Sequence, residues 1–249
     1  MMPVMGKKGK IMAVCLLLWS IFGLIGAENS RNFERIDAKQ GLSSGFVVNL
    51  LKDSRGILWL ATLNGLARYD GYHWKIYREG LNDPNTPQSL IILSLFEENR
   101  DILWIGTRGG LVRFDRSKES FKHYHVKLPG KTLDTFSQIS QIHQDNQNPD
   151  ILWLRVFVKL VSFNQRSGQK KIYGIGSDKS QLKSIKIVSH IYQDLSGLLW
   201  LVGDGKLLRY DPVSDKILPF RKKKIEDAVI SVTPSLIDPN IIWVGYEGY

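Results

Sequence analysis

The side chains that could do chemistry in this sequence are mostly histidines. His73, His123, His125, His143 and His190 all follow residue 27. His123 and His125 alternate along one predicted strand and therefore share a face, where two imidazoles could in principle hold a metal ion. We find no third histidine or paired acid in register with them. We therefore interpret the pair as solvent-exposed and expect no metal site.

Nucleophilic and phosphate-binding motifs are missing from the sequence. Cys15, the one cysteine, lies in an apolar run near the amino terminus. The chain has no Gly-x-Ser-x-Gly elbow and no glycine-rich phosphate loop. Its Asp-x-x-Gly turns lack the dense oxygen ligands of a calcium loop. We expect no catalytic residue and no cofactor, although a lyase or glycosidase site assembled from several repeats would leave no local motif.

The first 27 residues have the pattern of an export signal. Lys7, Lys8 and Lys10 precede an apolar run at 11–25, and small residues then lead to Glu28. The run has about 15 residues, which is short of the roughly 20 that span a bilayer. We expect cleavage and a periplasmic or secreted chain, with a retained membrane anchor as the alternative.

The charge balance is basic, with a formal net charge of +10. The run Arg221–Lys224 could suggest a nucleic-acid patch. An exported protein rarely meets nucleic acid, so we interpret the run as a solvated turn and expect no nucleic-acid partner. Acidic glycans or an anionic membrane surface are the alternatives for this patch.

One short motif returns along the chain at intervals of roughly 45 residues, the period of a propeller or array. Each copy places a tryptophan between aliphatic residues, and a leucine-led strand ending in an aromatic residue plus Asp or Asn follows most copies. An acidic or turn-forming break precedes most copies. The five tryptophans in register are Trp59, Trp104, Trp153, Trp200 and Trp243.

Each repeat reads as four short strands. In the first, we predict strands at 46–52, 57–62, 66–70 and 73–77, joined by turns that Asp caps and Gly permits. Short, evenly spaced strands indicate an all-β fold, and four strands at this period match one blade of a β-propeller.

The predicted boundaries leave an incomplete ring. A strand at 33–37 arrives before any blade of its own and would complete the last blade of a closed ring. About seven blades need roughly 320 residues, so we expect four to five blades of a probable seven and a piece of a longer protein. The predicted blades are 41–80, 81–130, 131–178, 179–222 and an incomplete 223–249.

The first unit resembles a known repeat. Residues 41–44, 53–62 and 64–72 look like the two-component regulator propeller repeat, and 101–115 fit it almost as well. The resemblance implies a periplasmic sensor that is often followed by an immunoglobulin-like segment, a transmembrane helix and a cytoplasmic histidine kinase, hybrid regulator or diguanylate cyclase. None of these output modules is in this sequence, so any membrane contact would come from a missing downstream helix or an uncleaved signal.

The resemblance also implies partners. Members with known cues often detect oligosaccharides, and a second propeller or a homodimer partner is expected beside the ligand. The alternative function is a freestanding secreted propeller that acts as a carbohydrate-active enzyme or an adhesion module. A transmembrane helix with a kinase or cyclase downstream would favour sensing.

Positions that differ between repeats are the candidates for ligand binding. Turns between the second and third strands carry Asn64, Arg108 and Asp204 on the face with the most variation. Arg155 stands where the other units have a small or apolar residue, so it needs a polar partner, water or a ligand if buried. By contrast, we expect the recurrent arginines to pair with the repeated Asp between blades. These are Arg68, Arg113 and Arg209.

Overall fold

The computed structural model of the protein describes residues 41–42, 44–78, 90–126, 128, 137–173, 187–220, 228–235, 237–238 and 241–247. The predicted signal at 1–27 and the predicted closing strand at 33–37 lie outside these residues. Within the described ranges, no helix is long and apolar enough to cross a membrane.

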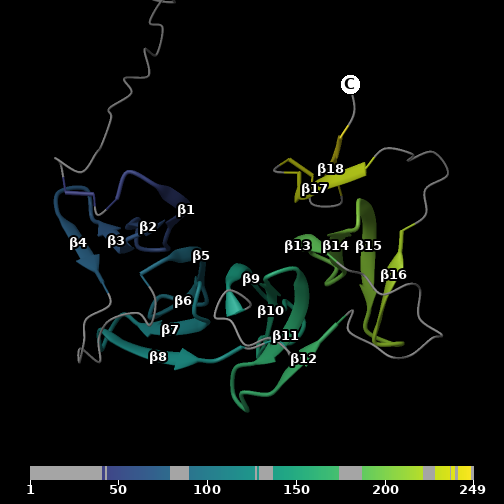
Figure 1. Ribbon diagram of the computed structural model, residues 1–249, viewed down its shortest axis with the longest axis horizontal. Helices are drawn as coiled ribbons and strands as arrows, with labels where there is room; N and C mark the ends of the chain where they lie inside the picture. Colours follow the sequence, from purple (N-terminus) through teal and green to yellow (C-terminus); the bar gives the residue numbers. More distant parts are fainter. Residues whose placement is uncertain are drawn as a thin grey trace, which may run out of the picture. The chain divides into compact units, whose positions relative to one another are not determined.

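The described chain folds into consecutive antiparallel sheets, which we call blades 1 to 5 (Figure 1). Blades 1 to 4 have four strands in chain order, and the described residues of blade 5 form two strands. The bounds in blade 1 are β1 Val47–Lys52, β2 Leu58–Thr62, β3 Gly65–Tyr69 and β4 Trp74–Tyr77.

The remaining strands repeat this plan. Blade 2 contains β5 Ile92–Glu97, β6 Ile102–Thr107, β7 Leu111–Asp115 and β8 Ser120–Tyr124. Blade 3 contains β9 Ile139–Gln144, β10 Ile151–Val156, β11 Lys159–Asn164 and β12 Lys170–Ile172. Blade 4 contains β13 Val188–Gln193, β14 Leu199–Gly203, β15 Lys206–Asp211 and β16 Lys216–Pro219, and blade 5 contains β17 Ala228–Pro234 and β18 Ile242–Glu247.

The turn between the first two strands of blade 1 is built by its own side chains. Asp53 Oδ1 accepts the backbone N–H groups of Arg55 and Ile57, both at 2.9 Å. Gly56 adopts a φ of 84°, which a residue without a Cβ reaches at no steric cost. The sequence signal of a capping Asp followed by Gly therefore specifies the hairpin.

Every blade carries an irregularity at the same place. The ladder between first and second strands shifts register near the start of the first strand, as at Ile92/Ser94 in blade 2 and Val229/Ser231 in blade 5. Blades 1, 3 and 4 share this shift. A bulge at a fixed place raises the local twist, so the blades are equivalent in shape as well as in sequence.

The core lies between neighbouring blades. Trp59 of blade 1 is buried in a cluster with Leu103, Ile105 and Phe114 of blade 2. Trp104 joins blade 3, Trp153 joins blade 4 and Trp200 joins blade 5 in the same manner. Since each tryptophan fills the gap to the next sheet, the predicted role of these residues in the core is confirmed.

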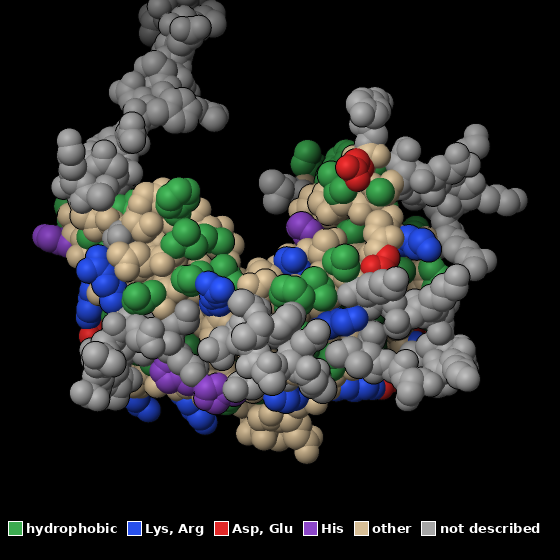
Figure 2. All heavy atoms as spheres, in the orientation of Figure 1, with side chains coloured by type: hydrophobic (Ala, Val, Ile, Leu, Met, Phe, Trp, Pro, Cys, Tyr) green, Lys and Arg blue, Asp and Glu red, His purple; other side chains and the backbone are tan. Residues whose placement is uncertain are grey.

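Apolar side chains are exposed on the first and the fifth blade. Phe46 and Leu50 in blade 1 are 72% and 59% exposed, and Trp243 in blade 5 is 63% exposed. Figure 2 shows hydrophobic side chains over both regions. Trp243 occupies the register of the buried tryptophans but has no following sheet within the described residues. The chain is thus an all-β protein made of β-propeller blades, as its repeat predicts.

Candidate functional site

The recurrent tryptophans are anchored at one end of the blades by the recurrent acids. Trp59 Nε1 donates a 2.8 Å hydrogen bond to Asp53 Oδ2. The acid lies in the turn that leads into the tryptophan's own strand, so one side chain both caps the turn and fixes the indole. The same bond joins Trp104 to Glu98, Trp153 to Asp145 and Trp200 to Asp194, at 2.8, 2.7 and 2.8 Å.

Hydrogen bonding lowers the pKa of two of these acids, Asp53 and Asp194. Burial alone would raise the pKa of Asp53, but bonds from Trp59, Ile57 and Arg55 and the charge of Arg116 together hold that pKa below its usual value. The pKa of Asp194 is lowered despite burial in the same way, by bonds from Ser196, Trp200 and Leu198. Acceptor bonds of this kind stabilise the charged form.

A buried ion network crosses the junction of blades 1 and 2. Arg116 Nη1 donates to Asp53 Oδ2 of blade 1 at 2.7 Å, and its Nη2 donates to Glu97 Oε1 at 2.7 Å. The Arg116 side chain is 3% exposed and that of Asp53 is 0% exposed. Arg116 also bonds to the carbonyl of Asn99. A guanidinium with this many acceptors links two sheets through directional bonds.

A second inter-blade contact recurs at the outer strands. Lys75 of β4 donates a 2.5 Å bond to Glu119 of blade 2, and its Nζ lies 5.1 Å from the centroid of the Tyr77 ring. The bond from Lys75 lowers the pKa of Glu119, and the reciprocal bond raises that of Lys75. We call this arrangement of lysine, tyrosine and acid the outer clasp.

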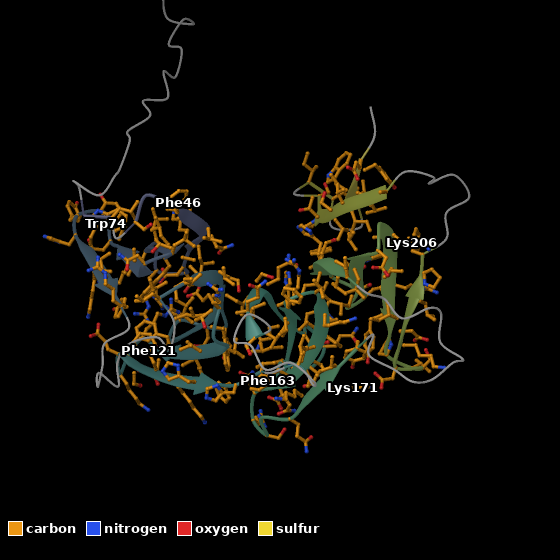
Figure 3. The ribbon with its side chains drawn as sticks, in the orientation of Figure 1. Phe46, Trp74, Phe121, Phe163, Lys171 and Lys206 are labelled. Carbon is orange, nitrogen blue, oxygen red and sulfur yellow. The ribbon has the colours of Figure 1, made fainter. Side chains whose placement is uncertain are left out.

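Blade 3 forms the outer clasp with blade 4. Lys171, which extends from β12 (Figure 3), pairs with Asp215, and its Nζ lies 5.0 Å from the centroid of the Tyr173 ring. The Tyr173 hydroxyl donates to Asp215 Oδ1 at 3.2 Å. Tyr77 makes the corresponding contact with Glu119 at 3.4 Å. Each clasp acid therefore accepts from both a lysine and a tyrosine.

We predicted that the recurrent arginines pair with acids between blades. For Arg68 this prediction is wrong, because its ion pair lies within its own blade. Arg68 Nη1 lies 3.9 Å from Asp70 Oδ2, two residues along the same strand ending. Residues two apart lie on one face of a strand, so the nearest carboxylate is local. Among the described residues, Arg113 and Arg209 form no ion pair within 4.0 Å. Lys75, Lys171 and Arg116 make the inter-blade contacts instead.

Asn64 and Arg108 lie at the end of the blades opposite the Trp–acid bonds. Thr62 Oγ1 accepts the backbone N–H of Asn64 at 3.1 Å, which fixes the turn of blade 1. The N–H of Gly65 donates to Leu90 O, and that of Arg108 donates to Ile91 O, at 2.7 and 3.0 Å. The two predicted residues thus flank the start of the first strand of blade 2.

Asp204 lies in the corresponding turn of blade 4. Its φ is 49°, and its Oδ1 accepts the backbone N–H of Ile187 at 2.9 Å. Its charge raises the pKa of Lys159 in blade 3 against the larger effect of burial, which lowers that pKa. The carboxylate therefore supports its own blade and also faces a cation of the preceding blade.

Arg155 braces blade 3 against blade 4. Its Nε donates a 2.9 Å bond to Val188 O, and burial lowers its pKa. At the junction of blades 2 and 3 the equivalent carbonyl, Ile139 O of blade 3, accepts a 2.9 Å bond from Ser94 Oγ of blade 2, beside Gly106. The long side chain of Arg155 therefore donates the inter-blade hydrogen bond that Ser94 donates at the preceding junction. Ligand contact by Arg155 stays a prediction.

The four predicted site residues form two pairs rather than one site. Asn64 and Arg108 lie at the junction of blades 1 and 2, and Arg155 and Asp204 lie at the junction of blades 3 and 4, where they bond to adjacent residues 188 and 187. Within the described part of the chain, no group of three or more His, Cys, Asp or Glu is placed to hold a metal ion.

Comparison with known families identifies the repeat. Residues 41–64 match the family described as two component regulator propeller. This segment, one copy of the unit that recurs along the chain, is similar to the two-component regulator propeller repeat. The match covers the residues just before β1, the strands β1 and β2, and the turn bearing Asn64. It thus includes the Asp53–Trp59 bond.

Similar proteins are found both in sequence and in fold. Histidine kinase P4 of Formosa agariphila is 35% identical over 80 residues, which is 30% of this chain and 5% of that protein. The extracellular domain of BT3049, a proposed hybrid two-component system of B. thetaiotaomicron, superposes with a TM-score of 0.69 at 20% identity, over 86% of this chain and 29% of that one. The extracellular domain of BT4673 from the same organism superposes with a TM-score of 0.60 at 20% identity, over 82% of this chain and 25% of that one. This chain thus spans less than a third of the length of each of these proteins.

The propeller repeat contains contacts that our sequence analysis missed. The outer clasp has a readable signal, because Lys75, Lys122 and Lys171 each stand two residues before a tyrosine at the period of the repeat. Arg116 has none, since it follows a strand at a position that holds Gly71 in blade 1. A side chain that occurs once cannot be recognised by recurrence.

Proposed function

We propose that this propeller is the exported sensor region of a two-component signalling protein. The observation that carries the proposal is the match at 41–64 to a repeat of two-component regulators, in a chain whose blades repeat that unit in register. Two kinds of similar protein support it, a histidine kinase in sequence and extracellular domains of proposed hybrid two-component systems in fold.

A sensor of this type needs a rigid frame and a variable surface. The Trp–acid bonds and the inter-blade contacts provide the frame, since they fix the sheets to one another. Turns on a rigid scaffold are the usual place for binding residues. The variable surface is the end of the blades that carries Asn64, Arg108 and Asp204, and an oligosaccharide is the ligand class we propose for it.

Signalling requires that the ligand bind one arrangement of the protein more tightly than another. We propose that a second propeller or a second copy of the chain completes the sensing unit, because a ligand held between two bodies can shift their relative positions. The propeller itself has no catalytic role in this proposal.

The test uses the full-length protein in its host, with transcription of its target genes as the readout and a defined panel of oligosaccharides as probes. Arg108→Ala should raise the effective ligand concentration by about tenfold, the effect of one lost charged contact. Lys118→Ala, an exposed cation in the turn of blade 2 at the opposite end, should leave the response unchanged.

Two results would contradict the proposal. Release of shortened oligosaccharides by the purified protein would favour a secreted carbohydrate-active enzyme. Binding of an oligosaccharide with no change in transcription, in a protein that lacks any kinase or cyclase module, would favour an adhesion module.

A further inference from the structure

The outer clasp is absent at the junction of blades 2 and 3. The clasp acids, Glu119 and Asp215, each immediately precede the fourth strand of their blade, with φ values of 49° and 54°. The residue in this register in blade 3 is Gly168, with a φ of 73°. Blade 3 therefore keeps the backbone conformation of the clasp but has no carboxylate there.

The lysine and tyrosine of the clasp are nevertheless present in blade 2. Lys122 Nζ lies 5.1 Å from the centroid of the Tyr124 ring, in the same geometry as Lys75 over Tyr77. Among the described residues, neither the Lys122 ammonium nor the Tyr124 hydroxyl has a carboxylate partner. Two donors that bind an acid at the neighbouring junctions are thus left available.

A second cation increases the positive charge at this place. Arg113 stands directly opposite Lys122 in the β7–β8 ladder. Like charges that face each other across strands destabilise a sheet. In blade 1 the equivalent pair, Arg68 and Lys75, is compensated by Asp70 and by Glu119. An anion between Arg113 and Lys122 would give blade 2 the same compensation.

A pocket of about 350 Å³ opens beside the Lys122 and Tyr124 side chains, the two groups that lack a clasp acid. Arg113, Lys122 and Tyr124 of blade 2 line it, with Arg166 of blade 3 on the other side. The two carboxylates that line the pocket, Glu98 and Asp150, already have partners. Glu98 accepts from the Trp104 indole at 2.8 Å, and Asp150 lies 2.8 Å from Arg166 Nε. The lining has three cations, Arg113, Lys122 and Arg166, and two acids, so the net charge of the pocket is positive.

We propose that the pocket between blades 2 and 3 binds the carboxylate of a small acidic ligand, which takes the place that Glu119 and Asp215 fill at the neighbouring junctions. Lys122 and Tyr124 contact the carboxylate, and Arg113 adds a second cation. Hexuronates fit this description, because the volume exceeds that of a carboxylate alone and leaves room for a sugar ring. The site goes beyond the proposed sensing surface, since it lies at the opposite end of the blades.

The experiment is calorimetric titration of the full-length protein with sodium D-glucuronate, D-glucose and sodium acetate. Glucuronate should bind and glucose should not. Acetate binding would show that the carboxylate alone is recognised, whereas binding of glucuronate without acetate would show that the sugar ring contributes. Equal binding of glucose and glucuronate, or no binding of either carboxylate, would overturn the proposal.

Variants at Gly168 give a sharp control. A Cβ at Gly168 meets no atom within 4 Å, so Gly168→Asp restores the clasp acid without a clash and should weaken glucuronate binding at least tenfold by occupying Lys122. Gly168→Asn has the same size and backbone strain but no charge, and it should leave binding within about twofold of the parent. Equal effects of the two variants would refute the carboxylate assignment.

Lys122→Met provides the complementary loss of charge and should also reduce glucuronate binding at least tenfold. Unchanged binding in Lys122→Met would overturn the proposal. Both measurements are independent of signalling output, so they distinguish failure of this site from failure of the proposed function.

Discussion

Arg116 of blade 2 donates a 2.7 Å hydrogen bond to Asp53 of blade 1, and both side chains are almost completely buried. The same Asp53 holds the Trp59 indole. One carboxylate therefore joins the turn, the core tryptophan and the next blade. Removal of one partner from a buried ion pair leaves an uncompensated charge, which costs much more than the pair contributes when complete.

Arg116→Met should lower the free energy of unfolding by roughly 3 to 5 kcal/mol, because it leaves Asp53 and Glu97 without their shared cation. Urea unfolding followed by tryptophan fluorescence measures the change. The control is Arg166→Met, which breaks the pair with Asp150; the Arg166 side chain is 81% exposed, so the cost should stay below about 1 kcal/mol. Similar losses in both variants would contradict the buried network.

Asp53 should also make stability depend on pH. The pKa of Asp53 in the folded protein lies below the ordinary value of 3.8. The folded protein therefore releases the Asp53 proton more readily than the unfolded chain does. The stabilisation is complete above pH 3.8 and is lost as the pH falls from there through the folded pKa. Asp53→Asn should be less stable than the parent at pH 7, and the gap should narrow below about pH 4. Thermal unfolding at several pH values measures this gap, and a constant gap from pH 7 to pH 3 would argue against an ionised Asp53.

Gly106 should tolerate no side chain. A Cβ at this position would lie 2.2 Å from Ser94 Oγ and 2.3 Å from Ile139 O of the next blade. Gly106→Ala should therefore cost about 1 to 3 kcal/mol through overpacking of the junction. Gly45→Ala is the matched control, because a Cβ there meets no atom within 4 Å. Differential scanning fluorimetry compares them, and equal melting temperatures would contradict the close approach of blades 2 and 3.

Arg155 should act as a brace between blades. Arg155→Met removes the donor to Val188 O and should lower stability by about 1 kcal/mol, the net value of one hydrogen bond. The response of the full-length protein to ligand should be unchanged at a temperature where the variant is folded. A lost response with unchanged stability would instead favour the ligand contact that the sequence suggested.

The sequence predicted the blades well because the blade is a local structure. The strands around Trp59 and the turn at Asp53 depend on residues close in the chain, and the repeat displays them several times. The role of the tryptophans as core residues followed from the same recurrence. The sequence also marked Arg155 as a residue that must find a partner, and Val188 O is that partner.

The inter-blade contacts could not be read as easily, because they join residues about one repeat apart in the chain. The partner of Lys75 is Glu119, and nothing near Lys75 identifies it. The expectation that Arg68 reaches the next blade was wrong because Asp70 is nearer on the same face. The vacant position at Gly168 becomes visible only when the strand registers of three blades are known.

Stacked blades require that the acids hold the tryptophans in equivalent places. Hydrogen exchange of the indole N–H groups, followed by nuclear magnetic resonance in deuterated water, tests this directly. We predict slow exchange for Trp59, Trp104, Trp153 and Trp200, whose side chains are buried. Exchange of these four indole protons as fast as that of a solvent-exposed indole would contradict the stacked blades on which the site and the function are built.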